Sequence, residues 1–147
     1  MEIDENAPAT AEGEIQVEAS PEVVWSVLSD IDDWPTWNSD IKMAKLDGPV
    51  EVGSTFRWKS GPASLTSTLR SVDPPREIGW TGTTMSIKAV HVFTLRPQDG
   101  RTLVRSEESW EGLVASMFKS YSRKTLSKGI QTILANLKRE AERRATA

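Results

Sequence analysis

The sequence has no cysteine and only one histidine. Without cysteine the chain has no disulfide framework, no thiol nucleophile, no iron–sulfur cluster and no thiolate zinc site. With His91 as the sole histidine, a multi-histidine metal site is excluded, and a Ser–His–Asp triad would have to use this residue. We therefore expect a protein without a metal or other cofactor, and the lack of cysteine favours the cytoplasm as its location.

Long apolar runs and phosphate-binding motifs are also missing. No apolar stretch is long enough to cross a bilayer, and neither a glycine-rich phosphate loop nor a G-x-S-x-G nucleophile elbow is present. Residues 1–12 carry four acidic residues and no basic one, so we expect neither a signal peptide nor a mitochondrial presequence there. This segment is predicted to be a disordered acidic leader.

The chain as a whole has the composition of one globular domain. Hydrophobic residues make up 37% and charged residues 27% of the 147 residues. A chain of this length hides roughly 68% of its unfolded surface on folding, which is enough for a genuine core. We therefore predict a single domain over residues 13–147.

The net charge of −3 is unevenly distributed. Residues 113–147 hold eight Lys and Arg against only Glu140 and Glu142, whereas the preceding part of the chain is acidic. Such asymmetry is compatible with a nucleic-acid or anionic-membrane contact, but a long helix with a solvated basic face has the same pattern. We favour the solvated helix and expect no nucleic-acid partner.

The order of elements follows from hydrophobic periodicity and turn residues. Residues 14–19 alternate like a strand, Ser20 and Pro21 are typical of a helix N-cap and first position, and residues 33–38 form a second short helix. Short turns then separate six predicted strands, at 41–46, 54–60, 63–72, 76–82, 86–96 and 101–111, which favours an antiparallel meander. Apolar residues at three- and four-residue steps predict one long helix from about 113 to 144. Gly129 interrupts it, at a bend or a close approach to the sheet.

Several short segments occur in an order that is typical of one superfamily. They are residues 14–25, Asp33-Trp34-Pro35-Thr36-Trp37-Asn38, Val52-Gly53-Ser54-Thr55-Phe56, Val72-Asp73-Pro74-Pro75-Arg76 with Ile78-Gly79-Trp80, His91-Val92-Phe93-Thr94-Leu95, and Gly100-Arg101-Thr102 with Glu107-Glu108. Over about residues 13–144 the chain resembles the START and birch-pollen-allergen (SRPBCC) superfamily, most closely its polyketide cyclase/dehydrase and lipid-transport branch. The resemblance implies an α+β helix-grip fold, in which a seven-stranded curved antiparallel sheet surrounds a long C-terminal helix, with two short helices after strand one. Some related families bind lipids or polyketides, a few catalyse cyclisation or dehydration, and others act on macromolecules. The fold by itself therefore does not assign a function.

In a helix-grip fold the space between sheet and helix becomes a cavity where the facing side chains leave room. We assign the aromatic-rich period-two faces inward, although Val90 and Val92 on the opposite face of their strand leave open that His91 points outward. The inward set combines apolar walls with a few polar groups, which is the usual lining of a small-molecule pocket, but the same residues are also compatible with a solid core. The candidate ligand-binding residues are Trp37, Phe56, Trp58, Leu69, Trp80, His91, Phe93, Ser106, Glu108, Trp110, Phe118 and Tyr121.

Three functions are compatible with these residues. The first is binding or transport of a small hydrophobic molecule, such as a lipid, an isoprenoid or a polyaromatic metabolite. The second is a polyketide cyclase or dehydrase that uses His91 and Glu108 as an acid–base pair, since burial raises a carboxyl pKa and histidine titrates near neutral pH. The third is a protein-interaction module with a filled core. Because few groups are suited to catalysis, we expect a binding protein rather than an enzyme.

Overall fold

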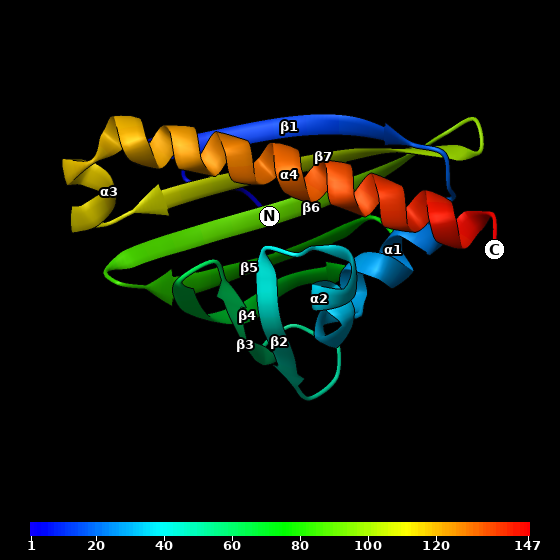
Figure 1. Ribbon diagram of the computed structural model, residues 1–147, viewed down its shortest axis with the longest axis horizontal. Helices are drawn as coiled ribbons and strands as arrows, with labels where there is room; N and C mark the ends of the chain where they lie inside the picture. Colours follow the sequence, from blue (N-terminus) through cyan, green and yellow to red (C-terminus); the bar gives the residue numbers. More distant parts are fainter.

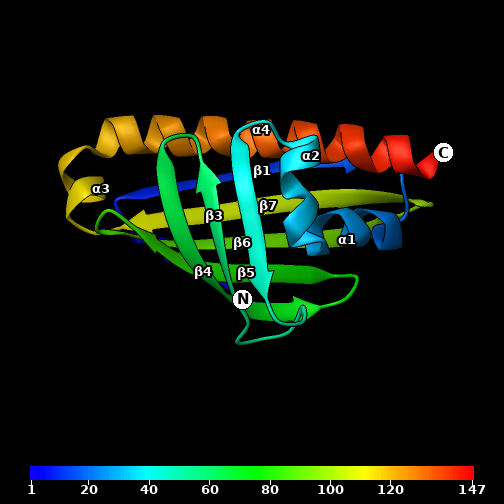
Figure 2. The ribbon, with the colours of Figure 1, turned by 60° about the horizontal axis from the view of Figure 1, so that its bottom comes forward.

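The computed structural model describes all 147 residues and contains one seven-stranded antiparallel sheet in the order β1-β7-β6-β5-β4-β3-β2. The sheet is strongly curved, and the long helix α4 lies across its concave face, with most of its contacts to β1 (Figures 1 and 2). This is the helix-grip arrangement, and the predicted fold class is confirmed. The elements are β1 (Ala9–Val17), α1 (Pro21–Ser29), the 3-10 helix η1 (Ile31–Asp33), α2 (Trp34–Trp37), β2 (Ile41–Asp47), β3 (Thr55–Ser60), β4 (Ala63–Asp73), β5 (Glu77–Thr84), β6 (Ile87–Gln98), β7 (Arg101–Glu111), α3 (Leu113–Met117) and α4 (Lys119–Ala145).

The entry into α1 follows the predicted chemistry. The Ser20 hydroxyl accepts a hydrogen bond from the backbone N–H of Val23 at 3.3 Å, and Pro21 occupies the start of the helix. The cap satisfies one of the backbone donors that a helix start leaves unpaired. The chain therefore turns from β1 into α1 at the predicted residue.

The single helix predicted over residues 113–144 is wrong, because the chain forms two helices that meet at Phe118. The backbone of Phe118 leaves the helical region, with φ −121° and ψ 52°. Before α3, Gly112 has φ 114°, and a Cβ at this position would collide with the Ser86 carbonyl. Periodicity misses the break because the apolar spacing continues through it; α3 redirects the chain so that α4 runs back along β1.

The contact between α4 and β1 depends on a small residue in the strand. A Cβ on Gly13 would lie 3.1 Å from both Ile130 Cγ2 and Leu134 Cδ1. Glycine therefore lets the helix approach the sheet closely here. Gly129 is exposed, with no atom within 4 Å of its would-be Cβ, so the predicted close approach to the sheet at Gly129 is wrong.

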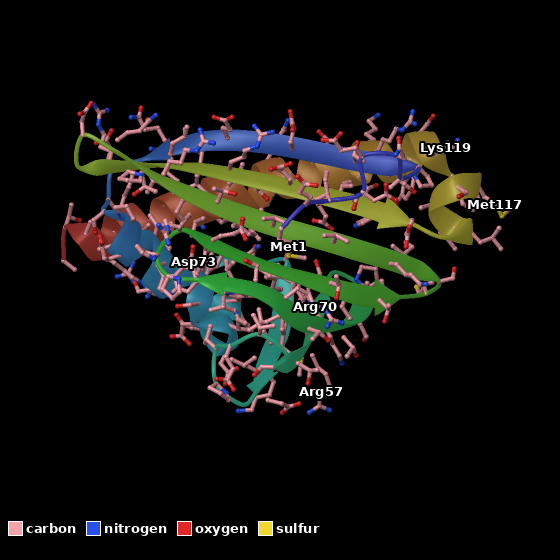
Figure 3. All side chains as sticks on the ribbon, turned by 180° about the vertical axis from the view of Figure 1, so that it is seen from behind. Met1, Arg57, Arg70, Asp73, Met117 and Lys119 are labelled. Atoms are coloured by element: carbon pink, nitrogen blue, oxygen red, sulfur yellow. The ribbon has the colours of Figure 1, made fainter.

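The predicted disordered leader over residues 1–12 also differs from the structure. β1 begins at Ala9 rather than at the predicted residue 14, and residues 9–12 pair with residues 107–110 of β7. The preceding residues lie along the outer face of the sheet, where the Met1 amino group contacts Glu77 at 3.2 Å (Figure 3). A Cβ on Gly79 would meet Met1 Sδ and Val92, which explains why outward-facing Val92 is nevertheless buried. Sequence patterning missed this cover because it comes from contacts distant along the chain.

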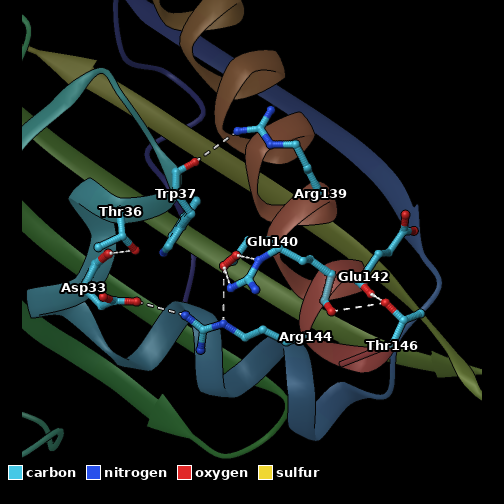
Figure 4. A network of polar contacts seen from close by, with 9 residues as sticks. Asp33, Thr36, Trp37, Arg139, Glu140, Glu142, Arg144 and Thr146 are labelled. Carbon is cyan, nitrogen blue, oxygen red and sulfur yellow. Dashed lines mark hydrogen bonds and ion pairs between the residues drawn. The ribbon is translucent and has the colours of Figure 1, made fainter.

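Polar contacts tie the C-terminal half of α4 to the helices after β1 (Figure 4). Arg144 contacts Asp33 at 2.9 Å and Glu140 at 3.5 Å, and Glu140 also binds Arg143 at 2.7 Å. The hydrogen bond from Arg143 lowers the pKa of Glu140, and the charges of Arg143 and Arg144 act in the same direction against the effect of burial. We refer to this end of the molecule, where α1, η1, α2 and residues 132–145 meet, as the closed end.

The opposite end of the sheet has no such cover. It consists of the turn between β5 and β6, the helix α3 and residues 119–131 of α4, and we refer to it as the open end (Figure 2). Solvent-exposed apolar side chains are concentrated there. None of the helices at either end combines the length with the apolar composition that a membrane-spanning helix requires.

Candidate functional site

The strand register brings the predicted polar groups onto one face of the sheet. His91 on β6 pairs with Trp80 on β5 and with Glu108 on β7. Directly paired residues in an antiparallel sheet point to the same side. On the next strand Gly13, which pairs with Ser106, lies under α4, so this is the concave face. The inward assignment of His91 is therefore correct, and the outward alternative is excluded.

Glu108, His91 and Ser106 form a continuous hydrogen-bonded array. His91 Nδ1 lies 3.0 Å from Glu108 Oε1, and His91 Nε2 lies 2.7 Å from Ser106 Oγ. An ionised carboxylate only accepts, so Nδ1–H donates to Glu108, and in a neutral imidazole Nε2 accepts the Ser106 hydroxyl proton. Trp110 Nε1 donates to the second carboxylate oxygen at 2.6 Å. The array fixes the tautomer and orientation of the imidazole, as an acid–base group requires.

Aromatic rings pack around this array in the middle of the concave face. Between ring centroids, Trp80 lies 5.0 Å from His91, and Phe93 stacks on His91 at 4.7 Å. The centroids of the Trp34 and Trp80 rings lie 5.3 Å apart. These distances are those of directly packed rings. The centre of the face is therefore filled by aromatic side chains.

The structure divides the predicted ligand-binding residues into three groups. Phe56, Leu69, Trp80 and Phe93 are almost fully buried against one another. Trp58, Glu108 and Trp110 are half-buried, and Phe118 and Tyr121 are exposed at the open end. His91 and Ser106 are buried, so within the array only the Glu108 carboxylate, with 16% of its side chain exposed, is in contact with solvent.

Trp37 lies apart from the other candidates. It is buried in α2 at the closed end, where its carbonyl accepts a hydrogen bond from Arg139 at 3.3 Å. Its indole Nε1 is buried without an acceptor. The structure therefore assigns Trp37 to the packing of the closed end and not to the array around His91.

Sequence reasoning overlooked a row of small residues beside the array. The row runs across four neighbouring strands. Gly82 on β5 pairs with Ala89 on β6, Ala89 pairs with Trp110 on β7, and Trp110 pairs with Ala9 on β1. This row is the next one toward the open end from the row of Trp80, His91 and Glu108. Small residues at inward positions were a readable signal, because they cannot fill the space under a helix.

Two depressions lie elsewhere on the molecule. One, of about 340 Å³, is bordered by the leader and β1, at residues such as Ile3, Glu12 and Glu107. The other, of about 420 Å³, is an open hollow along residues 116–121. Neither lies on the concave face beneath α4. No group of three or more His, Asp and Glu side chains could hold a metal ion.

Solved structures with the same fold share little sequence with this chain. An aromatase/cyclase, Zhui, from Streptomyces sp. R1128 is 18% identical, with a TM-score of 0.76 over 92% of this chain and 94% of its own. A START superfamily protein from Mycobacterium smegmatis is 18% identical, with a TM-score of 0.75 over 91% and 97%. A hypothetical protein from Helicobacter pylori is 15% identical, with a TM-score of 0.83 over 95% and 91%. At these identities the likeness is one of fold.

No curated protein sequence matches this chain at a significant level. Residues 8–142 match the family described as "Polyketide cyclase / dehydrase and lipid transport". This match and the helix-grip fold together support a ligand-binding or polyketide cyclase-type role. Because the match spans nearly the whole domain, the chain belongs to the polyketide cyclase/dehydrase and lipid transport family.

Proposed function

We propose that this protein binds a small hydrophobic molecule on the concave face of the sheet, entering from the open end. The observation that carries the proposal is the polar array of Glu108 and His91, whose carboxylate accepts a hydrogen bond from half-buried Trp110. Apolar walls with a few fixed polar groups are the general design of small-molecule sites. The carboxylate, held in place by the imidazole, would orient a polar group of an otherwise apolar ligand.

Ala89, within the row of small residues, supplies the room that such a ligand needs. It is half-buried on the concave side next to the array, and Gly129 of α4 has open space around it, whereas the Ser67 side chain covers Gly82. A ligand lying there would contact Trp110 on one side and the aromatic centre at its inner end. The filled centre limits the depth of the site, so we expect a ligand that is only partly enclosed.

Direct detection of a bound molecule tests the proposal. Native and denaturing mass spectra of freshly purified protein should differ by the mass of an apolar compound that is lost on unfolding. In parallel, binding of the uncharged fluorescent probe N-phenyl-1-naphthylamine should weaken at least about tenfold in Ala89→Leu, because the added side chain occupies the space beside the array. The matched control Val52→Leu adds apolar volume at an exposed loop and should leave binding unchanged.

Two results would count against the proposal. Equal probe affinity for wild type and Ala89→Leu, with both folded, would show that the probe binds elsewhere. No bound mass together with no saturable probe binding would favour a protein-interaction module with a filled core.

A second candidate is a cyclase or dehydrase, favoured by the contact between His91 and Glu108. In a dehydration, His91 Nε2, once released from the Ser106 hydroxyl, would remove a proton from the carbon next to a carbonyl. The resulting electron pair would expel a β-hydroxyl group, which takes that proton back from the imidazolium and leaves as water. Glu108 would stabilise the imidazolium formed. Ser106→Ala should reduce turnover of a polyketide-like β-hydroxyketone while leaving probe binding within about twofold, since Ser106 is buried and only catalysis requires the array to change protonation. Glu108→Gln should also reduce turnover. Unchanged turnover in both variants would eliminate this candidate.

A further inference from the structure

Five large apolar side chains project into solvent at the open end. They are Met85, Leu113, Met117, Phe118 and Tyr121, with exposed fractions between 56% and 78%. Of the other large hydrophobic residues, only Val52 is exposed to a comparable extent, at 60%. An exposed apolar concentration of this kind marks an interaction site rather than ordinary surface. We refer to these five residues as the apolar tip.

The apolar tip is one continuous part of the surface although its residues come from two segments. The turn that carries Met85 packs against the start of α3, because Ser86 lies directly beside Gly112. The other four residues follow within α3 and the beginning of α4. Figures 1 and 3 show α3, with Met117 labelled in Figure 3, projecting at one end of the molecule.

Positive charge immediately follows the apolar tip along α4. Lys119, Arg123, Lys124 and Lys128 are exposed, and no acidic residue occurs between residues 112 and 139. None of these four forms an ion pair, whereas three of the four cations in the second half of the same helix, Lys138, Arg143 and Arg144, do so. Lys119, Lys124 and Lys128 are therefore free to bind external anions, and Arg123, whose Nε donates to the Pro8 carbonyl at 3.0 Å, keeps its other N–H groups for the same purpose.

We propose that the apolar tip docks on the surface of an anionic lipid bilayer. Apolar and aromatic side chains would enter the headgroup region while the four cations bind lipid phosphates, which is the combination that holds peripheral proteins at membranes. The acidic remainder of the chain is repelled by the anionic bilayer, which orients the molecule with α3 toward the lipid. An acidic protein partner would satisfy the cations, but it would not require five projecting apolar side chains.

This docking stands independently of the proposed ligand binding. If both hold, the open end of the concave face borders the bilayer, so that an apolar molecule passes between membrane and protein without crossing bulk water. The apolar tip and the ligand entrance to the concave face would then act together at the open end.

Sedimentation of the full chain with lipid vesicles tests the proposal. We expect the protein to bind vesicles of phosphatidylcholine with about 30% phosphatidylglycerol, and to bind pure phosphatidylcholine at least about tenfold more weakly. Phe118→Ser should weaken binding to the anionic vesicles by about tenfold and Lys124→Gln by about fivefold. The matched controls Val52→Ser and Arg96→Gln, exposed and distant from α3, should change binding less than twofold.

A soluble polyanion separates docking from simple charge attraction. Phe118→Ser should retain wild-type binding to heparin while losing binding to vesicles, because heparin offers charge without an apolar phase. The proposal is overturned if the wild type does not sediment with anionic vesicles, or if Phe118→Ser and Val52→Ser sediment equally. Probe binding on the concave face, measured without lipid, should be the same in Lys124→Gln as in wild type, so failure of one proposal is distinguishable from failure of the other.

Discussion

The two halves of α4 differ although they belong to one continuous helix. Residues 132–145 pack on β1 and the helices α1 and α2. Three of their four cations are paired with Asp33, Glu140 and Glu142, and the fourth, Arg139, donates to the Trp37 carbonyl. Residues 119–131 bury a single face, at Ser122, Leu126 and Ile130, and leave their cations unpaired. One half of the helix is thus held by contacts on several sides, and the other half by contacts on one.

This difference separates stability from interaction within a small domain. Buried rings and paired charges at the closed end hold the sheet and helix in register. Apolar side chains and cations without partners at the open end contribute little to folding and remain available to a ligand or a surface. Functional regions are commonly drawn from the less stable parts of a structure.

The largest expected effect comes from removing an aromatic ring at the closed end. Trp34 is almost fully buried, donates to the Leu28 carbonyl at 3.0 Å and packs edge-on against Phe56. Trp34→Ala should lower the free energy of unfolding by about 3–5 kcal/mol, whereas Tyr121→Ala at the open end should change it by less than about 0.5 kcal/mol. Urea denaturation of both variants measures the contrast. A similar cost for the two substitutions would contradict the division of the molecule into these two ends.

A smaller effect is expected from the buried carboxylate of the closed end. Glu140 has its pKa lowered below its ordinary value of 4.5 in the folded protein, chiefly by the hydrogen bond from Arg143. Its charge therefore stabilises the fold above about pH 4.5, and this contribution is lost as the pH falls through the lowered pKa. Glu140→Gln should cost about 1–2 kcal/mol at neutral pH, because its partners are partly exposed and solvent screens the pairs.

The pH dependence provides the control for that substitution. The difference in stability between wild type and Glu140→Gln should shrink when urea denaturation is repeated at progressively lower pH. Glu51→Gln, at an exposed position outside any ion pair, should match wild type throughout. If the loss of unfolding free energy in Glu140→Gln stayed constant down to strongly acidic pH, packing and not charge would account for the stability of the closed end.

The smallest effect distinguishes two glycines on either side of the helix contact. Gly129→Ala should raise the free energy of unfolding by about 0.5–1 kcal/mol, because the added methyl meets no atom and helix propensity improves. Gly13→Ala should lower it by about 1 kcal/mol, since its methyl presses on Ile130 and Leu134. Thermal unfolding of the two variants is the measurement, and shifts of the same sign would show that α4 is not seated on β1 as described.

The sequence predicted more of the sheet than of the site. Alternation put His91 and Glu108 on the concave face, and the turn at Asp99 and Gly100 correctly separated their strands. Their direct contact depends on the exact register of β6 with β7, which alternation does not specify beyond its phase. The same register brings Ser106 into the array. Ser106 pairs with Phe93, two residues along β6 from His91, and its hydroxyl reaches the His91 imidazole from there.

Other features lay outside the reach of periodicity. The break at Phe118 changes the conformation of one residue without disturbing the apolar spacing on either side. The cover that Met1 provides on the outer face involves residues more than seventy positions apart in the chain. Both depend on contacts that form only when the sheet has already assembled.

Local chemistry in the sequence determined the order of elements: alternation defined the strands, Ser20 and Pro21 began the first helix, and turn residues separated the hairpins. Only the tertiary structure decided which apolar residues are core and which are free. Phe93 and Phe118 are the same residue type, yet one is fully buried beside Trp80 and the other is 56% exposed. The physical reason is that burial is a property of the neighbours that folding brings together, and α4 is long enough to pass beyond the part of the sheet that covers it.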